Sequence, residues 1–299
     1  MVARIPVEPP DRTPRLVSVC LPARDEEATI GPIVAAVRRD LIERKGLVDE
    51  IVVIDDGSTD ATAHIAASEG AAVFAQSSIL PELPAGTGKG NALWKSLYAC
   101  RGDVICWLDA DIRNFDTEFV TRLVRPLIDD RDLLFTKGYY RRPLNGEPNG
   151  GGRVTELVAR PLLSHWFPGL CDIIQPLSGE YAGRREILEQ LPFVEGWGVE
   201  LALLVDIAQR YGVDAITQVD LGVREHRNRP LEELGPQALA IFLAAIRRAG
   251  GVDVAPVAAE LVRYDDDHAR VAVPVEVRER PPMCTIPAYH ARFGRELTA

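Results

Sequence analysis

Two aspartates separated by one small residue, Asp109-Ala110-Asp111, follow the apolar run of residues 104–108. Hard divalent cations such as Mg²⁺ and Mn²⁺ prefer oxygen ligands and share their coordination shell with substrate phosphates. The acidic pair is weak evidence by itself, because a solvated turn has the same composition. Its position directly after a hydrophobic strand favours a site that binds a metal and a diphosphate.

A second acidic segment, Asp55-Asp56-Gly57-Ser58-Thr59-Asp60, also follows an apolar run. Ser, Thr and Asp side chains accept hydrogen bonds from the free amides at a helix start, so the segment is typical of a helix cap with a glycine turn. Its carboxylates also have the acceptor oxygens that bind uracil or ribose. The two interpretations are compatible.

Two glycine-rich segments are candidate anion sites. Gly86-Thr87-Gly88-Lys89-Gly90 lacks the spacing of a P-loop, which excludes that class of ATPase, and we expect Lys89 on a flexible loop near a diphosphate. Gly150-Gly151-Gly152-Arg153-Val154-Thr155 precedes a predicted helix, where free amides and the helix dipole favour a phosphate or carboxylate. A hinge followed by an ordinary cap is the alternative for the second segment.

Two basic segments are candidate anion pockets in a chain whose net charge is -10. They are Tyr139-Tyr140-Arg141-Arg142 and Arg224-Glu225-His226-Arg227-Asn228-Arg229. Neighbouring cations disfavour protonation of His226 and leave a neutral imidazole for a metal, while arginines bind carboxylates or phosphates in bidentate fashion. Glu200, before the apolar residues 201–208, is either a first-turn acid or a contact to sugar or acceptor hydroxyls.

The elements that must position these residues alternate between strands and helices. Apolar runs predict strands at 16–21, 50–55, 71–74 and 104–108, and helices begin near residues 30, 61 and 91. Such alternation predicts a mostly parallel α/β sheet, whose ligands bind beyond the carboxyl ends of the strands. The acidic loops after three of these strands should therefore converge. The second half predicts a strand at 133–139 and helices from 153 and at 231–249.

Composition bounds the class of protein. The chain has 299 residues, of which 46% are hydrophobic and 26% charged, values typical of a globular protein with one large domain and a C-terminal appendage. Its negative charge argues against a nucleic-acid partner. The five cysteines form no CxxC pair, and no apolar stretch is long enough for a signal or a membrane span, so we expect a cytoplasmic protein without stable membrane insertion.

Three of these segments, 55–60, 88–90 and 109–111, together with Pro22-Ala23-Arg24-Asp25-Glu26-Glu27 after the first predicted strand, resemble the GT-A glycosyltransferases of the family-2-like type. The segments 139–143, 150–157, 175–181 and 224–230 are similar to those of actinobacterial glucosyl-3-phosphoglycerate synthases, a retaining family. The resemblance implies a Rossmann-like GT-A fold, mostly parallel and flanked by helices, with a C-terminal helical extension. It divides the chain into a tail at 1–15, a catalytic domain at 16–236 (nucleotide-sugar half 16–112, acceptor half 113–236) and a helix and tail at 237–299.

The resemblance also implies an activity. Members move glucose from UDP-glucose to the 2-hydroxyl of 3-phosphoglycerate with Mg²⁺ or Mn²⁺, and they are homodimers. Asp56 and Ala110 stand where mycobacterial members have serine, and Trp197 stands where they have tyrosine. These departures lie on the donor side and leave GDP-mannose open as the donor of a mannosyl-3-phosphoglycerate synthase. A sugar-phosphate nucleotidyltransferase and a non-catalytic sugar-nucleotide-binding protein are the more distant alternatives.

By position, the resemblance assigns roles to individual residues. The nucleotide sugar would contact Pro22, Ala23, Arg24, Glu26, Asp56, Lys89, Asp109, Ala110 and Asp111. The acceptor would contact Gly152, Arg153, Thr155, Asn228 and Arg229. The metal ligands would be Asp111 and His226, and the catalytic group would comprise Asp109, Glu200, Arg224 and the carbonyl of Leu177.

Overall fold

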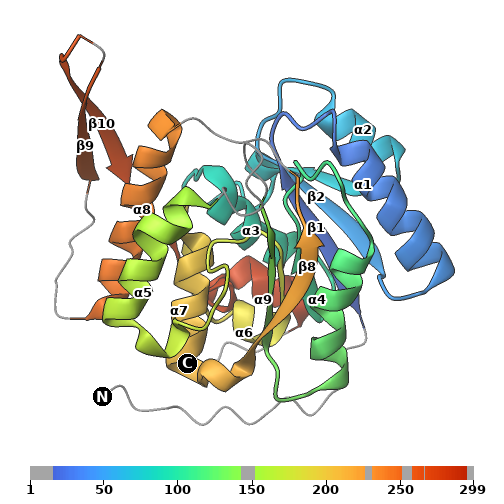
Figure 1. The fold of residues 1–299 in the computed structure, drawn as a ribbon. Helices are drawn as coiled ribbons and strands as arrows, with labels where there is room; N and C mark the ends of the chain where they lie inside the picture. Colours follow the sequence, from blue (N-terminus) through green and yellow to red (C-terminus); the bar gives the residue numbers. More distant parts are fainter. Residues whose placement is uncertain (1–15, 143–151, 226–230, 251–257, 266, 295–299) are drawn as a thin grey trace.

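The computed structural model describes residues 16–142, 152–225, 231–250, 258–265 and 267–294. Within these residues, seven strands form a central sheet of order β3-β2-β1-β4-β6-β5-β8, and two further sheets have two strands each. Only β6 runs antiparallel to its neighbours in the central sheet. The predicted GT-A arrangement, a mostly parallel sheet flanked by helices, is confirmed (Figure 1).

The strands and helices have the following bounds. The strands are β1 (Val17–Ala23), β2 (Glu50–Asp55), β3 (Ala72–Ala75), β4 (Val104–Trp107), β5 (Phe135–Arg141), β6 (Tyr181–Arg184), β7 (Phe193–Val194), β8 (Ile216–Val223), β9 (Ala258–Tyr264), β10 (Arg270–Glu276) and β11 (Glu279–Arg280). The α-helices are α1 (Ile30–Ala36), α2 (Thr62–Ser68), α3 (Gly88–Ala99), α4 (Glu118–Asp129), α5 (Arg160–Trp166), α6 (Arg185–Leu188), α7 (Val199–Tyr211), α8 (Leu231–Ala249) and α9 (Pro287–Phe293). Helix α1 continues as a π-helical segment, Val37–Arg44.

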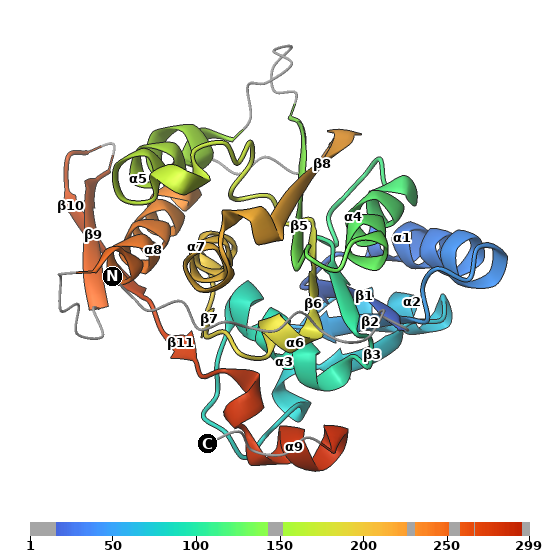
Figure 2. The ribbon, with the colours of Figure 1, turned by 90° about the horizontal axis from the view of Figure 1, so that it is seen from below.

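The central sheet is buried on both faces. Successive strand residues point to opposite sides, so each strand contributes side chains to both cores. In β4, Val104 and Cys106 join the core on one face, whereas Ile105 and Trp107 join the core on the other. Helices α1, α2 and α4 pack on the first face, and α3 and α7 pack on the second, where α8 packs on α7 and α5 packs on α8 (Figure 2). Continuous apolar runs in β1, β2 and β4 follow from this double burial.

Helix α3 begins earlier than the sequence predicts, and this corrects the expected placement of Lys89. Residues 88–90 form the first turn of α3 and not a flexible loop. Gly90 is required there, since a Cβ atom at this position would lie 1.8 Å from the carbonyl oxygen of Val194. Lys89 therefore projects from a helix that packs directly on β7.

The C-terminal part of the chain contains strands that the sequence analysis does not predict. The hairpin of β9 and β10 extends from the body of the molecule beside α8 (Figure 1). Strand β11 instead pairs with β7, and α9 inserts the fully buried Tyr289 into the main core. The predicted boundary at 236/237 falls inside α8, and the division of the chain into domains stays a prediction.

The helices that the structure describes include none that is both long and apolar enough to cross a bilayer.

Candidate active site

A cavity of about 530 Å³ lies at the carboxyl ends of β1, β2 and β4. The loops that follow these strands contribute Glu26, Asp56 and Asp111 to its wall, so the predicted convergence of the three acidic loops is confirmed. The cavity also brings together predicted residues from both halves of the chain: Pro22, Ala23, Arg24, Lys89, Asp109, Ala110, Gly152, Arg153, Thr155, Leu177, Glu200 and Arg224. Their assigned roles stay predictions.

Three other predicted residues, His226, Asn228 and Arg229, lie outside the described residues.

Arg224 holds the two aspartates of the Asp109-Ala110-Asp111 segment. One guanidinium nitrogen, Nη2, lies 2.8 Å from a carboxylate oxygen of Asp109 and 2.7 Å from one of Asp111. The arginine side chain is 3% exposed, whereas the aspartates are 24% and 29% exposed toward the cavity. The buried cation therefore fixes two carboxylates that still face a ligand.

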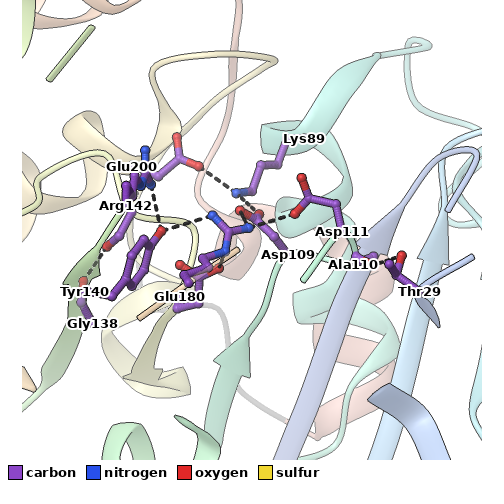
Figure 3. A network of polar contacts seen from close by, with 12 residues as sticks. Thr29, Lys89, Asp109, Ala110, Asp111, Gly138, Tyr140, Arg142, Glu180 and Glu200 are labelled. Atoms are coloured by element: carbon purple, nitrogen blue, oxygen red, sulfur yellow. Dashed lines mark hydrogen bonds and ion pairs between the residues drawn. The ribbon is translucent and has the colours of Figure 1, made fainter. Parts of the chain in front are cut away.

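Lys89 joins the acidic segment to helix α7. Its ammonium lies 2.5 Å from Asp109 and 2.8 Å from Glu200, a residue in the first turn of α7 (Figure 3). Burial acts to lower the pKa of Lys89, but the attraction of Asp109 and Glu200 outweighs it and raises the pKa well above its usual value. The lysine is thus a permanent cation in the cavity wall, where charge interactions are stronger than in water.

Beneath these groups lie Glu180, to which the sequence analysis assigns no role, and Tyr140 and Arg142 of a predicted anion pocket. Glu180 is fully buried and lies 3.1 Å from Nε of Arg224. The hydroxyl of Tyr140 accepts hydrogen bonds from Arg224 and Arg142 at 3.1 Å and 2.7 Å. The single charge of Glu180, among small and apolar residues directly before β6, is the signal that could have found it, because isolated charges are rarely buried without a partner.

The geometry of Gly179 explains why the Glu180 segment can approach the acidic pair. A Cβ atom at residue 179 would lie 2.1 Å from a carboxylate oxygen of Asp109. Only glycine fits this close approach. The segment that carries Leu177 and Glu180 therefore packs directly beneath the Asp109 carboxylate.

The carboxylates of the site have different proton affinities. Burial acts to raise the pKa of Asp109, but Lys89 and Arg224 outweigh it and hold the pKa far below its usual range. Burial raises the pKa of Asp111 and of Glu180, and Arg224 opposes both shifts. Asp109 is accordingly the group most firmly held as an anion.

Asp56 and Ala110 connect the acidic loops to their neighbours on the predicted nucleotide side. The side chain of Asp56 accepts a hydrogen bond from the amide of Gln76, and burial raises its pKa. The carbonyl of Ala110 accepts a hydrogen bond of 2.6 Å from the hydroxyl of Thr29. The predicted helix cap differs in detail: the N-cap residue of α2 is Ala61, which has no side-chain cap, and the carboxylate of the preceding Asp60 accepts a hydrogen bond of 2.9 Å from the backbone amide of Thr62. These contacts order the loops that line the cavity.

The residues at the carboxyl end of β4 fit a divalent cation that shares its shell with a diphosphate. Among the described residues no group of three or more His, Cys, Asp or Glu side chains has the arrangement of a complete metal site. Asp111 nevertheless presents a partly exposed carboxylate to the cavity. Mg²⁺ and related ions are commonly held by one or two carboxylates plus substrate phosphates, so this donor set suits them.

The sequence model of glycosyl transferase family 2 matches residues 18–191. This match and the observed fold place the chain in glycosyltransferase family 2.

More specific relatives share nearly the whole chain. Glucosyl-3-phosphoglycerate synthase of Petrotoga mobilis is 47% identical over 291 residues, which cover 94% of this chain and 90% of that protein. The enzyme of the same name from Mycolicibacterium smegmatis is 46% identical over 276 residues, covering 91% and 90%. The chain belongs to the glucosyl-3-phosphoglycerate synthase family.

Solved structures of a mycobacterial relative agree with this assignment. Glucosyl-3-phosphoglycerate synthase from Mycobacterium tuberculosis, in complex with Mn²⁺, UDP-glucose and phosphoglyceric acid, is 45% identical with a TM-score of 0.80 and 91% coverage of each chain. A complex of the same enzyme with Mg²⁺ and UDP is 44% identical, with a TM-score of 0.82 and coverage of 91% of this chain and 92% of that one.

Proposed function

We propose that this protein transfers glucose from UDP-glucose to the 2-hydroxyl of 3-phosphoglycerate, giving glucosyl-3-phosphoglycerate with retention of configuration. One observation carries the proposal: a single cavity joins the acidic loops of the nucleotide half to Arg153 and Thr155 of the acceptor half. Relatives that match nearly the whole chain have this activity in their names, and solved complexes of one contain UDP-glucose and phosphoglyceric acid.

The cations of the cavity fit the departure of a nucleoside diphosphate. When the bond between glucose C1 and the diphosphate oxygen breaks, negative charge develops on that oxygen, and a fixed cation nearby lowers the barrier. Lys89 is held by Asp109 and Glu200 in the wall of the cavity, so its charge requires no reorganisation during the reaction. We assign it to the diphosphate.

Mg²⁺ or Mn²⁺ completes this environment. We assign Asp111 and His226 as its protein ligands, and the bound ion would neutralise the diphosphate as a Lewis acid. Arg224 bridges Asp109 and Asp111, which keeps the two carboxylates oriented.

The acceptor is assigned to the other end of the cavity. Gly152 has a φ of +81° directly before the helix that begins at Arg153, and the side chains of Arg153 and Thr155 line the same wall. Amides at a helix start and a guanidinium favour a phosphate or carboxylate. Asn228 and Arg229 would complete the acceptor site.

The charges around the cavity support attack from the same face as the departing diphosphate. A double displacement needs a nucleophile that forms a covalent sugar adduct. The carboxylate of Glu200 pairs with Lys89, and that of Asp109 pairs with Lys89 and Arg224. Each is thus held by a cation, which argues against its acting as that nucleophile. In the front-face route, the 2-hydroxyl bonds to C1 as the C1–O bond breaks, and its proton passes to the departing diphosphate.

A turnover assay tests the proposal. UDP-glucose or GDP-mannose is supplied with Mg²⁺ or Mn²⁺, with and without 3-phosphoglycerate, and nucleoside diphosphate release is followed. We expect UDP release that depends on the acceptor and that chelation of the metal abolishes. Acceptor-dependent GDP release would instead identify a mannosyltransferase. Pyrophosphate release from UTP and a sugar phosphate would identify a nucleotidyltransferase. UDP binding without turnover would identify a non-catalytic binding protein.

We also propose that the protein is a cytoplasmic homodimer. All five cysteines are free, which fits a reducing compartment. Apolar side chains on α5 and α8, Trp166 and Phe242, are partly exposed with their ring centroids 6.2 Å apart, and partly exposed apolar groups of this kind occur at subunit interfaces. Sedimentation of the full chain tests the dimer, and a monomer at micromolar concentration would contradict it.

A further inference from the structure

We propose that Arg142 binds the carboxylate of the acceptor, an inference that rests on the proposed function. Arg142 directly follows β5, and β5 has the same direction as β4 because both run antiparallel to β6. The residue therefore lies at the edge of the sheet where β4 presents Asp109, and it is one of the residues that line the cavity.

The charge balance of the cavity distinguishes Arg142 from two other cations. Arg224 has three carboxylate partners, Asp109, Asp111 and Glu180, and Lys89 has two. Within the described ranges of the chain, no carboxylate forms an ion pair with Arg142. A guanidinium in a partly buried wall without a counter-ion favours an anionic ligand.

Arg142 is also held in a fixed orientation. Its Nη2 donates a hydrogen bond of 2.7 Å to the hydroxyl of Tyr140, and its guanidinium lies 5.0 Å from the centre of that ring (Figure 3). Its Nε is buried and has no hydrogen-bond partner among the residues that the structure describes. The guanidinium is therefore positioned by a neutral phenol while part of its donor capacity is unused.

The neighbours of Arg142 identify which end of the acceptor it meets. Tyr140 also accepts a hydrogen bond from Arg224, the residue that holds Asp109, so Arg142 lies one side chain away from the group around the transfer centre. In 3-phosphoglycerate the carboxylate is attached to the carbon that bears the reacting 2-hydroxyl. The phosphate is one carbon farther away and is assigned to the helix start at Arg153. Arg142 therefore takes the carboxylate.

Binding of 3-phosphoglycerate to the UDP–Mg²⁺-loaded full-length protein, measured by calorimetry, tests the inference. We expect Arg142→Met to weaken this binding about tenfold or more, because a charge-assisted hydrogen bond is lost. Arg142→Lys, which keeps the charge but not the planar fork, should restore part of the affinity. UDP affinity should stay unchanged in both variants. Arg141→Met is the matched control, since the neighbouring Arg141 side chain is exposed and does not line the cavity.

Glycerol 3-phosphate, which lacks the carboxylate, separates the two anionic ends of the acceptor. Measured as a competitor of 3-phosphoglycerate, it should bind the wild type and Arg142→Met equally. An equal loss of affinity for both compounds would overturn the carboxylate assignment, as would unchanged binding of 3-phosphoglycerate to Arg142→Met. A wild type that binds 3-phosphoglycerate without glucosyl transfer would contradict the proposed function and leave the comparison of affinities valid.

Discussion

The guanidinium of Arg224 and the carboxylate of Glu180 lie 3.1 Å apart, and their side chains are 3% and 0% exposed. Removing one partner of a buried ion pair leaves the other charge uncompensated, which typically costs about 3–5 kcal/mol. In Glu180→Gln, Arg224 still pairs with Asp109 and Asp111. We therefore expect the free energy of unfolding to fall by an amount at the lower end of this range, about 3 kcal/mol. Urea denaturation measures this loss.

The control for Glu180 is Glu156→Gln, which removes an exposed pair with Arg160 one helical turn away. Such pairs contribute about 0.3–0.5 kcal/mol. If Glu180→Gln unfolded at the same urea concentration as Glu156→Gln, Glu180 would not be the internal counter-ion of Arg224.

Lys89→Met tests the electrostatic role of the lysine in the cavity wall. Removing one preorganised group that stabilises developing charge commonly lowers kcat by about 10²–10³. We expect a loss of that size, with a smaller change in KM for UDP-glucose, in steady-state UDP release. Lys45→Met, which breaks an exposed pair with Glu118, should retain wild-type kcat. Comparable kcat values in the two variants would rule out the assigned role of Lys89.

Lys137 predicts a pH dependence of stability. Its ammonium is buried, donates a hydrogen bond of 2.7 Å to the carbonyl of Ser178, and lies over the ring of Tyr181. Burial lowers the pKa of Lys137 to about 7, although the nearby carboxylates Glu200 and Glu180 act to raise it. Below that pH the folded protein carries the full cost of a buried cation.

Between about pH 7 and the pKa of a lysine in the unfolded chain, near 10.5, Lys137 is protonated in the unfolded chain but not in the folded protein. Its unfavourable contribution to the free energy of unfolding therefore becomes smaller as pH rises. We expect the free energy of unfolding of the wild type to rise relative to Lys137→Met by up to about 1.4 kcal/mol per pH unit between pH 7 and 9. Denaturant titrations at several pH values measure the difference. A difference that stayed constant or fell with pH would show that Lys137 titrates normally.

Arg280 connects the C-terminal segment to the walls of the cavity. Its Nε lies 2.8 Å from Asn91 of α3 and 2.6 Å from Glu195, which precedes the cavity residues Gly196 and Trp197. We expect Arg280→Met to lower stability by about 3 kcal/mol, since it leaves Glu195 without its buried partner. Arg278→Met, on the same segment but exposed, should cost less than about 1 kcal/mol. Equal thermal denaturation midpoints for the two variants would contradict the structural role of Arg280.

The nucleotide half of the fold follows most directly from its sequence. In the second half, α8 has the predicted bounds 231–249 and β5 overlaps the predicted strand at 133–139, but β6 and β8 are not predicted. The buried strands β1, β2 and β4 appear as continuous apolar runs because both faces of the sheet are covered. Strand β6 has four residues, two of which are Gly183 and Arg184, so it has no hydrophobic period that a sequence pattern detects. In β8 the alternation is confined to Val219, Leu221 and Val223, a stretch too short to stand out by itself.

The residues of the site also divide into those that the sequence indicates and those that it does not. Asp109, Asp111 and Lys89 stand out because acidic and glycine-rich segments interrupt apolar runs. Glu180 becomes part of the site only when β6 pairs between β4 and β5, a long-range contact that local patterns do not encode. Arg280 likewise depends on the pairing of β11 with β7. Contacts between distant segments therefore determine the groups that support the site.

The configuration of the product tests the central claim most directly. The wild type is incubated with Mg²⁺, UDP-glucose labelled with ¹³C at C1, and 3-phosphoglycerate, and the anomeric signals are followed by NMR. We predict a single new α-glucosyl signal, with a correlation from its C1 to the carbon that bears the 2-hydroxyl of the acceptor. A β-linked product, or only free glucose, would contradict retaining transfer to 3-phosphoglycerate in this cavity.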